Sequence, residues 1–228
     1  MPRVFDVISH AQKPLWFVTA NPEILLEARR NPLYHQALLQ ADARLVDGFG
    51  LWCALRLQGE CPSRLTGVDL AEEMIRFSIQ KQWKMVLLGG ASTHAAGEAM
   101  RKRYPDARID AEEAGTIGVD GTTDERTDEA MSRITLLAPD VLLIGFGHPK
   151  QEQWIARHLH EFPSVKVVIG VGGTFDVWSG RIQRAPQWMR TLGLEWSWRV
   201  IREPSRIGRI FHAIIVFPWV WMLDKIRK

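Results

Sequence analysis

Cysteine is scarce in this chain of 228 residues, which contains only Cys53 and Cys61. Two cysteines cannot build a multi-disulfide framework or a cysteine-based metal cluster, and their scarcity fits a reducing compartment best. His, Asp and Glu residues also show no spacing typical of metal ligands. We therefore expect no metal site and no cofactor.

Long hydrophobic runs are also missing. The N-terminal segment MPRVFDVISHAQKP lacks the apolar stretch of a signal peptide. Residues 210–223, IFHAIIVFPWVWML, are strongly apolar, but His212 and Pro218 interrupt them. A helix needs about 20 apolar residues to cross a bilayer, so this segment is too short to span one. We expect a cytoplasmic protein.

The usual nucleotide-binding and hydrolase motifs are absent. The sequence contains no GxGxxG and no GxxxxGK[ST], since the nearest glycine-rich turn reads GGASTHAAG. It also contains no GxSxG. A nicotinamide-dependent oxidoreductase would need the first of these motifs, so its absence disfavours that class.

Positive charge is scarce outside the C-terminal segment. The net charge is +3, yet residues 199–228 hold seven Lys and Arg against two acids, which leaves 22 basic and 24 acidic residues elsewhere. Five of the ten tryptophans also lie in the last 41 residues. The basic residues thus accompany an apolar tail, and no nucleic-acid-binding motif is present, so we expect no nucleic-acid partner.

Short apolar segments alternate with helical patterns along most of the chain. Residues 68–79 and 151–162 show helical periodicity. Several of the apolar segments are hydrophobic at every position, which is typical of strands covered on both faces. The predicted strands are residues 15–18, 43–46, 84–88, 140–146 and 166–171.

This alternation predicts an α/β fold with a doubly wound, mostly parallel, Rossmann-like sheet. The character of the chain changes near Arg184-Ala185-Pro186, after which we expect only helices. We therefore predict an α/β domain at residues 1–190, followed by a helical, basic and apolar C-terminal appendage at 191–228.

Glycine or small polar residues follow every predicted strand. Ligands bind at the carboxyl ends of the strands in an open parallel sheet, where glycines let backbone N–H groups approach an anion. A nucleotide diphosphate would suit such an edge. The alternative is that these glycines only make tight turns. The segments are residues 19–22, 47–50, 89–92, 147–152 and 172–176.

Four of these segments carry a side chain able to take part in catalysis or recognition. Gly145 to Trp154, GFGHPKQEQW, combine a lysine, an amide and a carboxylate in one turn, which is more than a change of direction needs. Asp47 ends a predicted strand and would serve either as a general base or as a helix N-cap. The same alternatives stand for Asp176 and Glu152, and His148 alone is weak support for either role.

The combination of motifs resembles the WecG/TagA/CpsF family of bacterial glycosyltransferases. The resemblance rests on GFGHPKQEQWI and on GVGGTFDVWSGRIQRAPQWMRTLGLEWSWRVIREPSRIGR. TANPE, ARLVDGFG and RLTGVDL match further family motifs in the same order. It extends from about Trp16 to Arg209.

The resemblance implies an inverting, metal-independent transferase. Such an enzyme moves N-acetylmannosamine, its uronic acid or glucose from a UDP-sugar to a polyprenyl-diphosphate-linked saccharide, at the inner face of the cytoplasmic membrane. Asp47 would be the catalytic base and Thr19 its companion. Gln151 and Glu152 would hydrogen-bond the uridine or ribose, and Lys150 would face the diphosphate.

The family motifs imply two further sets of binding residues. The nucleotide-sugar-binding residues would be Asn21, Gly48, Gly89, Gly90, Gly147, Pro149, Lys150, Gln151, Glu152, Gly172, Gly173, Phe175, Asp176 and Arg184. The residues that bind the lipid diphosphate would be Arg199, Arg206 and Arg209, with Arg202 as an extra candidate. Arginine suits this task because its guanidinium binds two oxygens at once.

The tail residues 210–223 suit a membrane surface. Trp219 and Trp221 lie beside Lys225 and other basic residues, as in interfacial helices. The alternative is a C-terminal helix packed on the core. The sequence also leaves open a non-catalytic, membrane-associated protein that binds a sugar nucleotide, since Asp47 would serve equally well as a helix cap. It leaves open a homo-oligomer as well.

Overall fold

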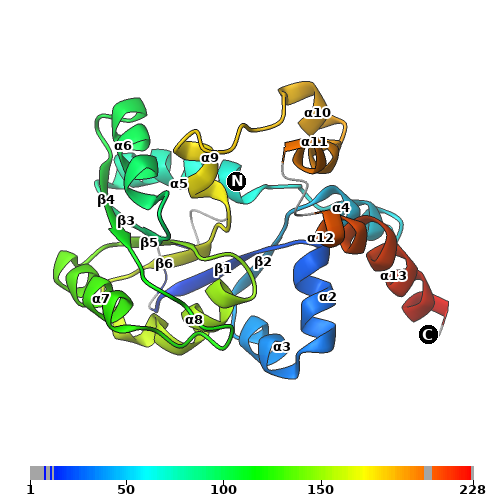
Figure 1. Ribbon diagram of the computed structural model, residues 1–228, viewed down its shortest axis with the longest axis horizontal. Coiled ribbons are helices and arrows are strands. Elements are labelled where there is room, and N and C mark those ends of the chain that lie inside the picture. Colours follow the sequence, from blue (N-terminus) through cyan, green and yellow to red (C-terminus); the bar gives the residue numbers. More distant parts are fainter. Residues whose placement is uncertain (1–7, 9–10, 12, 203–206, 227–228) are drawn as a thin grey trace.

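The computed structural model describes residues 8, 11, 13–202 and 207–226, without the side chains of residues 199, 209 and 224–226. Its centre is a six-stranded sheet with the order β2-β1-β6-β5-β3-β4, in which every pair of neighbouring strands is parallel (Figure 1). The strands are β1 (Leu15–Ala20), β2 (Ala43–Val46), β3 (Lys84–Gly89), β4 (Arg108–Glu113), β5 (Val141–Gly145) and β6 (Val167–Gly170).

The sequence predicts five of these strands, and β4 is the one it misses. The β4 segment reads RIDAEE and lacks the apolar run of its neighbours. It lies at the edge of the sheet and pairs only with β3. Its acidic side chains face helix α7 (Glu125–Leu137), where Arg133 binds Glu112 at 2.8 Å and Arg126 binds Glu113 at 3.0 Å. An edge strand that pairs charges with a helix has no need of an apolar pattern.

Helices cover both faces of the sheet and so produce two hydrophobic cores. On one face, α7, α2 (Pro22–Arg30), α3 (Pro32–Leu39) and α8 (Lys150–His158) pack around Trp16 and Ile144. On the other face, α5 (Gly67–Lys81), α6 (Thr93–Arg103) and α9 (Thr174–Trp178) pack around Phe17 and Leu143. The predicted helices at 68–79 and 151–162 correspond to α5 and to α8 with the short turn η1 (Leu159–Glu161), so both predictions are confirmed.

After residue 186 the described part of the chain contains helices and no strand, as the sequence predicts. They are α10 (Gln187–Thr191), α11 (Glu195–Arg202), α12 (Ile207–Phe211), the π-helical turn η3 (His212–Val216) and α13 (Phe217–Ile226). η3 contacts α2, and α13 contacts both α2 and α4 (Phe49–Arg56). Among the described residues, no helix combines the length and apolarity that crossing a membrane requires.

The connections of β1 and β6 fix where a ligand can enter. These two strands are neighbours in the sheet, yet β1 leads into α2 on one face and β6 leads into α9 on the other. The two helices diverge, and a crevice is left at the carboxyl ends of β1 and β6. This is where open α/β sheets bind ligands.

Phe175 explains two of the glycines at the strand ends. Its side chain is 3% exposed and lies over the ends of β3 and β5. A Cβ on Gly89 would lie 2.8 Å from the Phe175 ring, and one on Gly145 would lie 2.5 Å from it. These glycines therefore make room for an aromatic ring of the core.

Substitution of Gly89 by alanine is expected to destabilise the fold by about 1–3 kcal/mol, because the new methyl group overlaps Phe175 and Thr93. Gly90→Ala is the matched control, since no atom lies within 4 Å of its added Cβ. That variant should stay within about 0.5 kcal/mol of the wild type. Urea unfolding of the two variants measures the difference, and equal losses would contradict the packing role of Phe175.

Candidate active site

A cavity of about 370 Å³ opens at the crevice between β1 and β6. Most of its wall comes from the segments that follow β1, β2, β5 and β6, which are four of the five expected from the sequence, and the rest comes from residues 66–68 and Glu195. The predicted site residues that line it are Thr19, Asn21, Asp47, Gly147, Lys150, Gln151, Gly172, Gly173 and Asp176.

Asp47 directly follows β2, and its backbone N–H donates to the Ala20 carbonyl at 2.8 Å. Its Oδ1 accepts a hydrogen bond from the Gly48 N–H at 2.6 Å, and its Oδ2 accepts one from the Gly67 N–H at 3.4 Å. Helix α4 begins at Phe49 with Gly48 as its N-cap and has no side-chain cap. Asp47 therefore does not cap α4, which was the alternative to a role as general base.

Thr19 lies beside the same glycine. Its hydroxyl donates to the Gly170 carbonyl at 3.2 Å, which joins β1 to β6. A Cβ on Gly67 would lie 3.7 Å from the Thr19 oxygen, while the Gly67 N–H already faces Asp47. Gly67 thus brings Thr19 and Asp47 together in the wall of the cavity.

The turn between β5 and α8 presents positive charge to the cavity. Gly147 has φ +75°, a conformation that favours glycine, and Pro149 caps α8 without a side-chain hydrogen bond. Lys150 is the first residue of that helix and lines the cavity. His148 Nε2 lies 3.3 Å from the Glu23 carboxylate across the opening. A lysine at a helix N-terminus favours an anionic ligand.

Glu152 lies outside this cavity. Its side chain is 1% exposed and accepts hydrogen bonds from Gln151 and from Tyr34 of α3. Burial raises the pKa of the Glu152 carboxyl, against the opposing effects of the Gln151 hydrogen bond and of His148. Burial and the Glu152 charge also raise the pKa of Tyr34. The sequence-based expectation of a contact between Glu152 and the uridine or ribose therefore has no support in this placement.

Several other predicted site residues also lie away from the lining of this cavity. Phe175 packs in the core, Gly89 makes room for it, and Pro149 caps α8. Gly48 lines a neighbouring pocket, and Gly90 lies in an exposed turn directly after β3.

Asp176 lines the cavity and is held by the turn after β3. Its carboxylate accepts a hydrogen bond from the Ser92 hydroxyl at 2.6 Å and lies 3.6 Å from the guanidinium of Arg181. The β3 turn, including Gly90, thus supports the cavity through Ser92 rather than by lining it.

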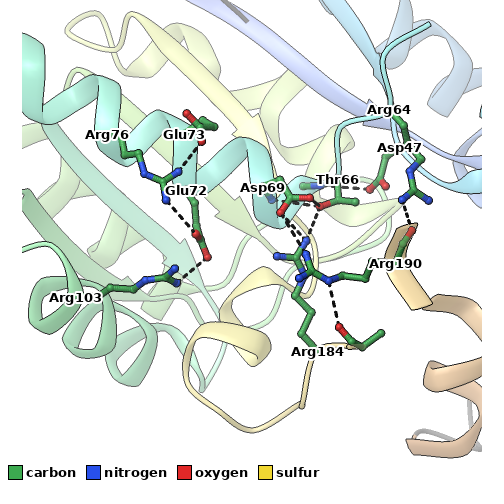
Figure 2. A network of polar contacts seen from close by, with 12 residues as sticks. Asp47, Arg64, Thr66, Asp69, Glu72, Glu73, Arg76, Arg103, Arg184 and Arg190 are labelled. Atoms are coloured by element: carbon green, nitrogen blue, oxygen red, sulfur yellow. Dashed lines mark hydrogen bonds and ion pairs between the residues drawn. The ribbon is translucent and has the colours of Figure 1, made fainter. Parts of the chain in front are cut away.

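Arg184 belongs to a network at the start of α5 (Figure 2). Its guanidinium donates to Asp69 at 2.7 Å and to the Thr66 hydroxyl at 3.1 Å. Thr66 caps α5 by accepting from the Asp69 N–H. Arg190 of α10 adds a longer ion pair to Asp69 at 3.9 Å. We call Asp69, Arg184 and Arg190 the Asp69 latch.

The Asp69 latch joins the C-terminal helices to the residues around Asp47. Arg64 donates to the Arg190 carbonyl at 2.5 Å, so the segment before α5 is held to α10 a second time (Figure 2). The latch thereby fixes the beginning of α5, where the Gly67 N–H meets Asp47. Arg184 acts in this structure as a link between segments, whereas the sequence predicts a contact with the nucleotide sugar.

A second pocket of about 250 Å³ adjoins the first. Its wall includes apolar residues of the C-terminal helices, among them Ile210, Ala213 and Ile214. Asp47 lines both pockets and therefore stands at their junction. The residues shared by the two pockets are Asn21, Glu23, Asp47, Thr66 and Glu195.

Several residues of the first cavity are not among the predicted site residues, and they include Glu23, Thr66, Gly67 and Glu195. Thr66 carries a usable signal, because a threonine three residues before an acid is typical of a helix N-cap. Glu195 has no such signal, since it reaches the cavity only through the fold of the C-terminal helices.

The predicted lipid-diphosphate residues fall where the structure gives no side chains. Arg206 lies outside the described residues, as do the side chains of Arg199 and Arg209. Arg202 donates to the Gln183 side chain at 2.8 Å, and its guanidinium lies over the Trp198 ring. The roles of these arginines stay predictions.

The C-terminal helices present one apolar face to the core and one to the outside. Phe217 is 6% exposed and packs in the core cluster that includes α2 and α4. Ile207, Phe211, Ile215 and Trp219 recur every fourth residue and are each more than half exposed. We call these four residues the outer stripe. The helix thus packs on the core, which was one of the two alternatives from the sequence, while its outer stripe is exposed and its binding to a membrane surface stays a prediction.

No group of three or more His, Cys, Asp or Glu side chains is arranged to hold a metal ion within residues 8, 11, 13–202 and 207–226. Both cysteines are free thiols.

Asp69→Asn is expected to weaken the latch in a pH-dependent way. Burial alone would raise the pKa of Asp69, but hydrogen bonds from Thr66 and Arg184, with the charges of Arg184 and Arg190, lower it below 3.8. A lowered pKa contributes stability above the unfolded value that is lost as pH falls. Because the side chain is 42% exposed, we expect a loss of about 1 kcal/mol at neutral pH.

The measurement is the free energy of unfolding in urea at neutral pH and near pH 3. The difference in the free energy of unfolding between wild type and Asp69→Asn should shrink as pH falls below 3.8. In that range the wild-type carboxyl takes up its proton first in the unfolded chain and then, at lower pH, in the folded protein. Glu73→Gln, which removes the exposed pair with Arg76, serves as the control. A difference that stays constant with pH would contradict an ionic latch.

Known proteins are similar to this chain over most of its length. A family model described as the glycosyl transferase WecG/TagA/CpsF family matches residues 1–228. Proteins of Staphylococcus aureus strains MRSA252, MW2 and NCTC 8325 are 36% identical over 199 residues, which cover 86% of this chain and 75% of each relative. Each is named N-acetylglucosaminyldiphosphoundecaprenol N-acetyl-beta-D-mannosaminyltransferase. The chain therefore belongs to the WecG/TagA/CpsF family of glycosyl transferases.

Proposed function

We propose that this glycosyltransferase moves a sugar from a UDP-sugar to a polyprenyl-diphosphate-linked saccharide, with inversion and without a metal ion. The observation that carries the proposal is the position of Asp47 between a polar cavity and a more apolar pocket. The names of the relatives favour N-acetylmannosamine as the sugar and N-acetylglucosaminyldiphosphoundecaprenol as the acceptor. The uronic acid and glucose stay the alternative donors.

The polar cavity is the proposed donor site. The nucleotide would bind at the carboxyl ends of the parallel strands, as it does in Rossmann-like folds. Gly147 and Gly172 both have positive φ, and no atom lies within 4 Å of a Cβ added to either, so a ligand can come close to these loops while Gln151 holds their N–H groups. The α8 N-terminus and the Lys150 ammonium supply positive charge for a diphosphate. These groups are the proposed means of stabilising the leaving UDP without a metal ion.

The second pocket is the proposed acceptor site. Its apolar wall comes from the helices that also carry the outer stripe. A lipid-linked saccharide held there would place a sugar hydroxyl near Asp47, while its polyprenyl chain stays at the membrane. We accordingly propose a catalytic domain at residues 1–190 and an appendage at 191–228 that rests on the cytoplasmic face of the membrane.

The chemistry proposed for Asp47 is general base catalysis. Its carboxylate takes the proton of the acceptor hydroxyl while that oxygen forms a bond to the anomeric carbon of the donor. The bond between this carbon and the diphosphate oxygen breaks, and its electron pair leaves with UDP. A single displacement from the opposite face inverts the configuration. Thr19, beside the shared Gly67, is the companion residue in this pocket.

Asp47→Asn is expected to lower transfer by roughly 10²–10⁴-fold, because the amide cannot accept the proton. UDP binding should stay close to that of the wild type, since the donor groups are unchanged. The assay is UDP release from UDP-N-acetylmannosamine with a polyprenyl-diphosphate-GlcNAc acceptor and EDTA, alongside UDP calorimetry.

Asp106→Asn, an exposed aspartate beyond α6, controls for the loss of one charge. Turnover at the wild-type level in Asp47→Asn would remove Asp47 from the role of base. UDP-sugar binding without transfer by the wild type would select the alternative, a non-catalytic sugar-nucleotide-binding protein.

Replacing Ile215 and Trp219 together by serine is expected to reduce binding to vesicles several-fold, because the outer stripe loses half of its members. Co-sedimentation with vesicles that contain anionic lipid measures this. The control is Val119→Ser with Leu136→Ser, two apolar residues that are 66% and 86% exposed elsewhere on the molecule. Equal sedimentation of both double variants would count against a membrane-facing stripe.

A further inference from the structure

The buried carboxylate of Glu152 is fully occupied by protein donors. Its Oε1 accepts from Gln151 Nε2 at 2.7 Å, and its Oε2 accepts from the Tyr34 hydroxyl at 3.0 Å. The side chain is 1% exposed and does not line the cavity. Burying a carboxylate is costly unless both oxygens are hydrogen-bonded. We therefore look for the role of Glu152 in the residues to which it is hydrogen-bonded.

The residue that it holds, Gln151, joins the two glycine loops of the cavity. Its Oε1 accepts from the Gly147 N–H at 3.2 Å and from the Gly172 N–H at 3.0 Å. Gly147 lies between β5 and α8, and Gly172 lies between β6 and α9. One amide oxygen therefore bridges the two loops beyond the last backbone hydrogen bond between β5 and the segment after β6.

The amide of Gln151 must point one way for this to work. An amide has an acceptor end and a donor end of nearly the same shape. The two loop N–H groups need the acceptor, while the Glu152 carboxylate accepts only from the donor. Gly170 leaves room for the donor end, because a Cβ there would lie 2.7 Å from Gln151 Nε2.

We propose that Glu152 is a positioning residue, which orients the Gln151 amide and through it fixes the two glycine loops for the donor diphosphate. The inference rests on the proposed function of the cavity as the nucleotide-sugar site. In this proposal Glu152 does not contact the nucleotide. It acts on the loops indirectly, through its hydrogen bond to Gln151 and the hydrogen bonds from the loops to Gln151.

The first test is Glu152→Gln in the full-length chain. The new side chain keeps one acceptor oxygen for two former donors. When that oxygen stays with Tyr34, its NH2 group faces the NH2 group of Gln151, so the Gln151 amide is expected to turn away from the loops. We expect the UDP Kd from calorimetry to rise at least about ten-fold, the usual effect of losing a hydrogen bond to a charged group. Thermal unfolding of the same samples reports the stability.

Tyr34→Phe separates positioning from simple support of the core. It removes one donor to Glu152 and leaves the contact with Gln151 in place. We expect a lower thermal midpoint with a UDP Kd within about two-fold of the wild type. The matched controls are Glu72→Gln and Tyr104→Phe, a half-buried pair far from the cavity with the same hydroxyl-to-carboxylate bond, at 3.5 Å. Neither should change the UDP Kd.

A swapped double variant tests the orientation of the amide itself. With Gln151→Glu and Glu152→Gln combined, residue 151 again accepts from both loops and residue 152 again accepts from Tyr34. The variant should regain most of the thermal midpoint lost in Glu152→Gln. It provides a folded sample even if the single variant does not fold, and failure to regain the midpoint would overturn the proposed orientation.

The outcomes separate this inference from the proposed function. A wild-type protein that binds no UDP would overturn both. If the wild type binds UDP, an unchanged UDP Kd in Glu152→Gln would overturn this inference alone. An equal rise in Kd for Tyr34→Phe and Glu152→Gln would also overturn it, because UDP affinity would then follow core stability.

Discussion

The site depends on one constraint, which is that the connections after β1 and β6 run to opposite faces of the sheet. These neighbouring strands continue into helices on different faces of the sheet, so the chain leaves the edge between them open. Polar side chains from six separate segments meet there, although the segments are far apart in the sequence. The loops must then be held by their own contacts. Gln151 holds the two glycine loops, and Gly67 connects Asp47 with Thr19.

Asp47 relates the two halves of the molecule. On one side it faces the polar cavity of the sheet, and on the other it faces the pocket walled by the C-terminal helices. The Asp69 latch and Arg64 hold α10 against the start of α5, which carries the hydrogen bond to Asp47 (Figure 2). The position of the C-terminal helices is therefore coupled to the residue that we propose as the base.

The sequence predicts the sheet well because its central strands are buried on both faces and read as continuous apolar runs. It misses β4, whose acids pair with α7 at the sheet edge. At the site, nine of the residues predicted from their place near the end of a strand line the cavity, but that place does not predict where a side chain points. Glu152 turns inward to Tyr34, and Arg184 turns to Asp69. These directions depend on partners that are distant in the sequence.

Hydrogen–deuterium exchange of the full-length protein, with and without UDP, tests the central claim most directly. If the crevice between β1 and β6 is the donor site, UDP slows exchange in residues 145–152 and 171–176. Exchange in the turn at residues 89–92, which supports the cavity only through Ser92, should change much less. Protection centred on residues 89–92, with none at the other two segments, would contradict this account.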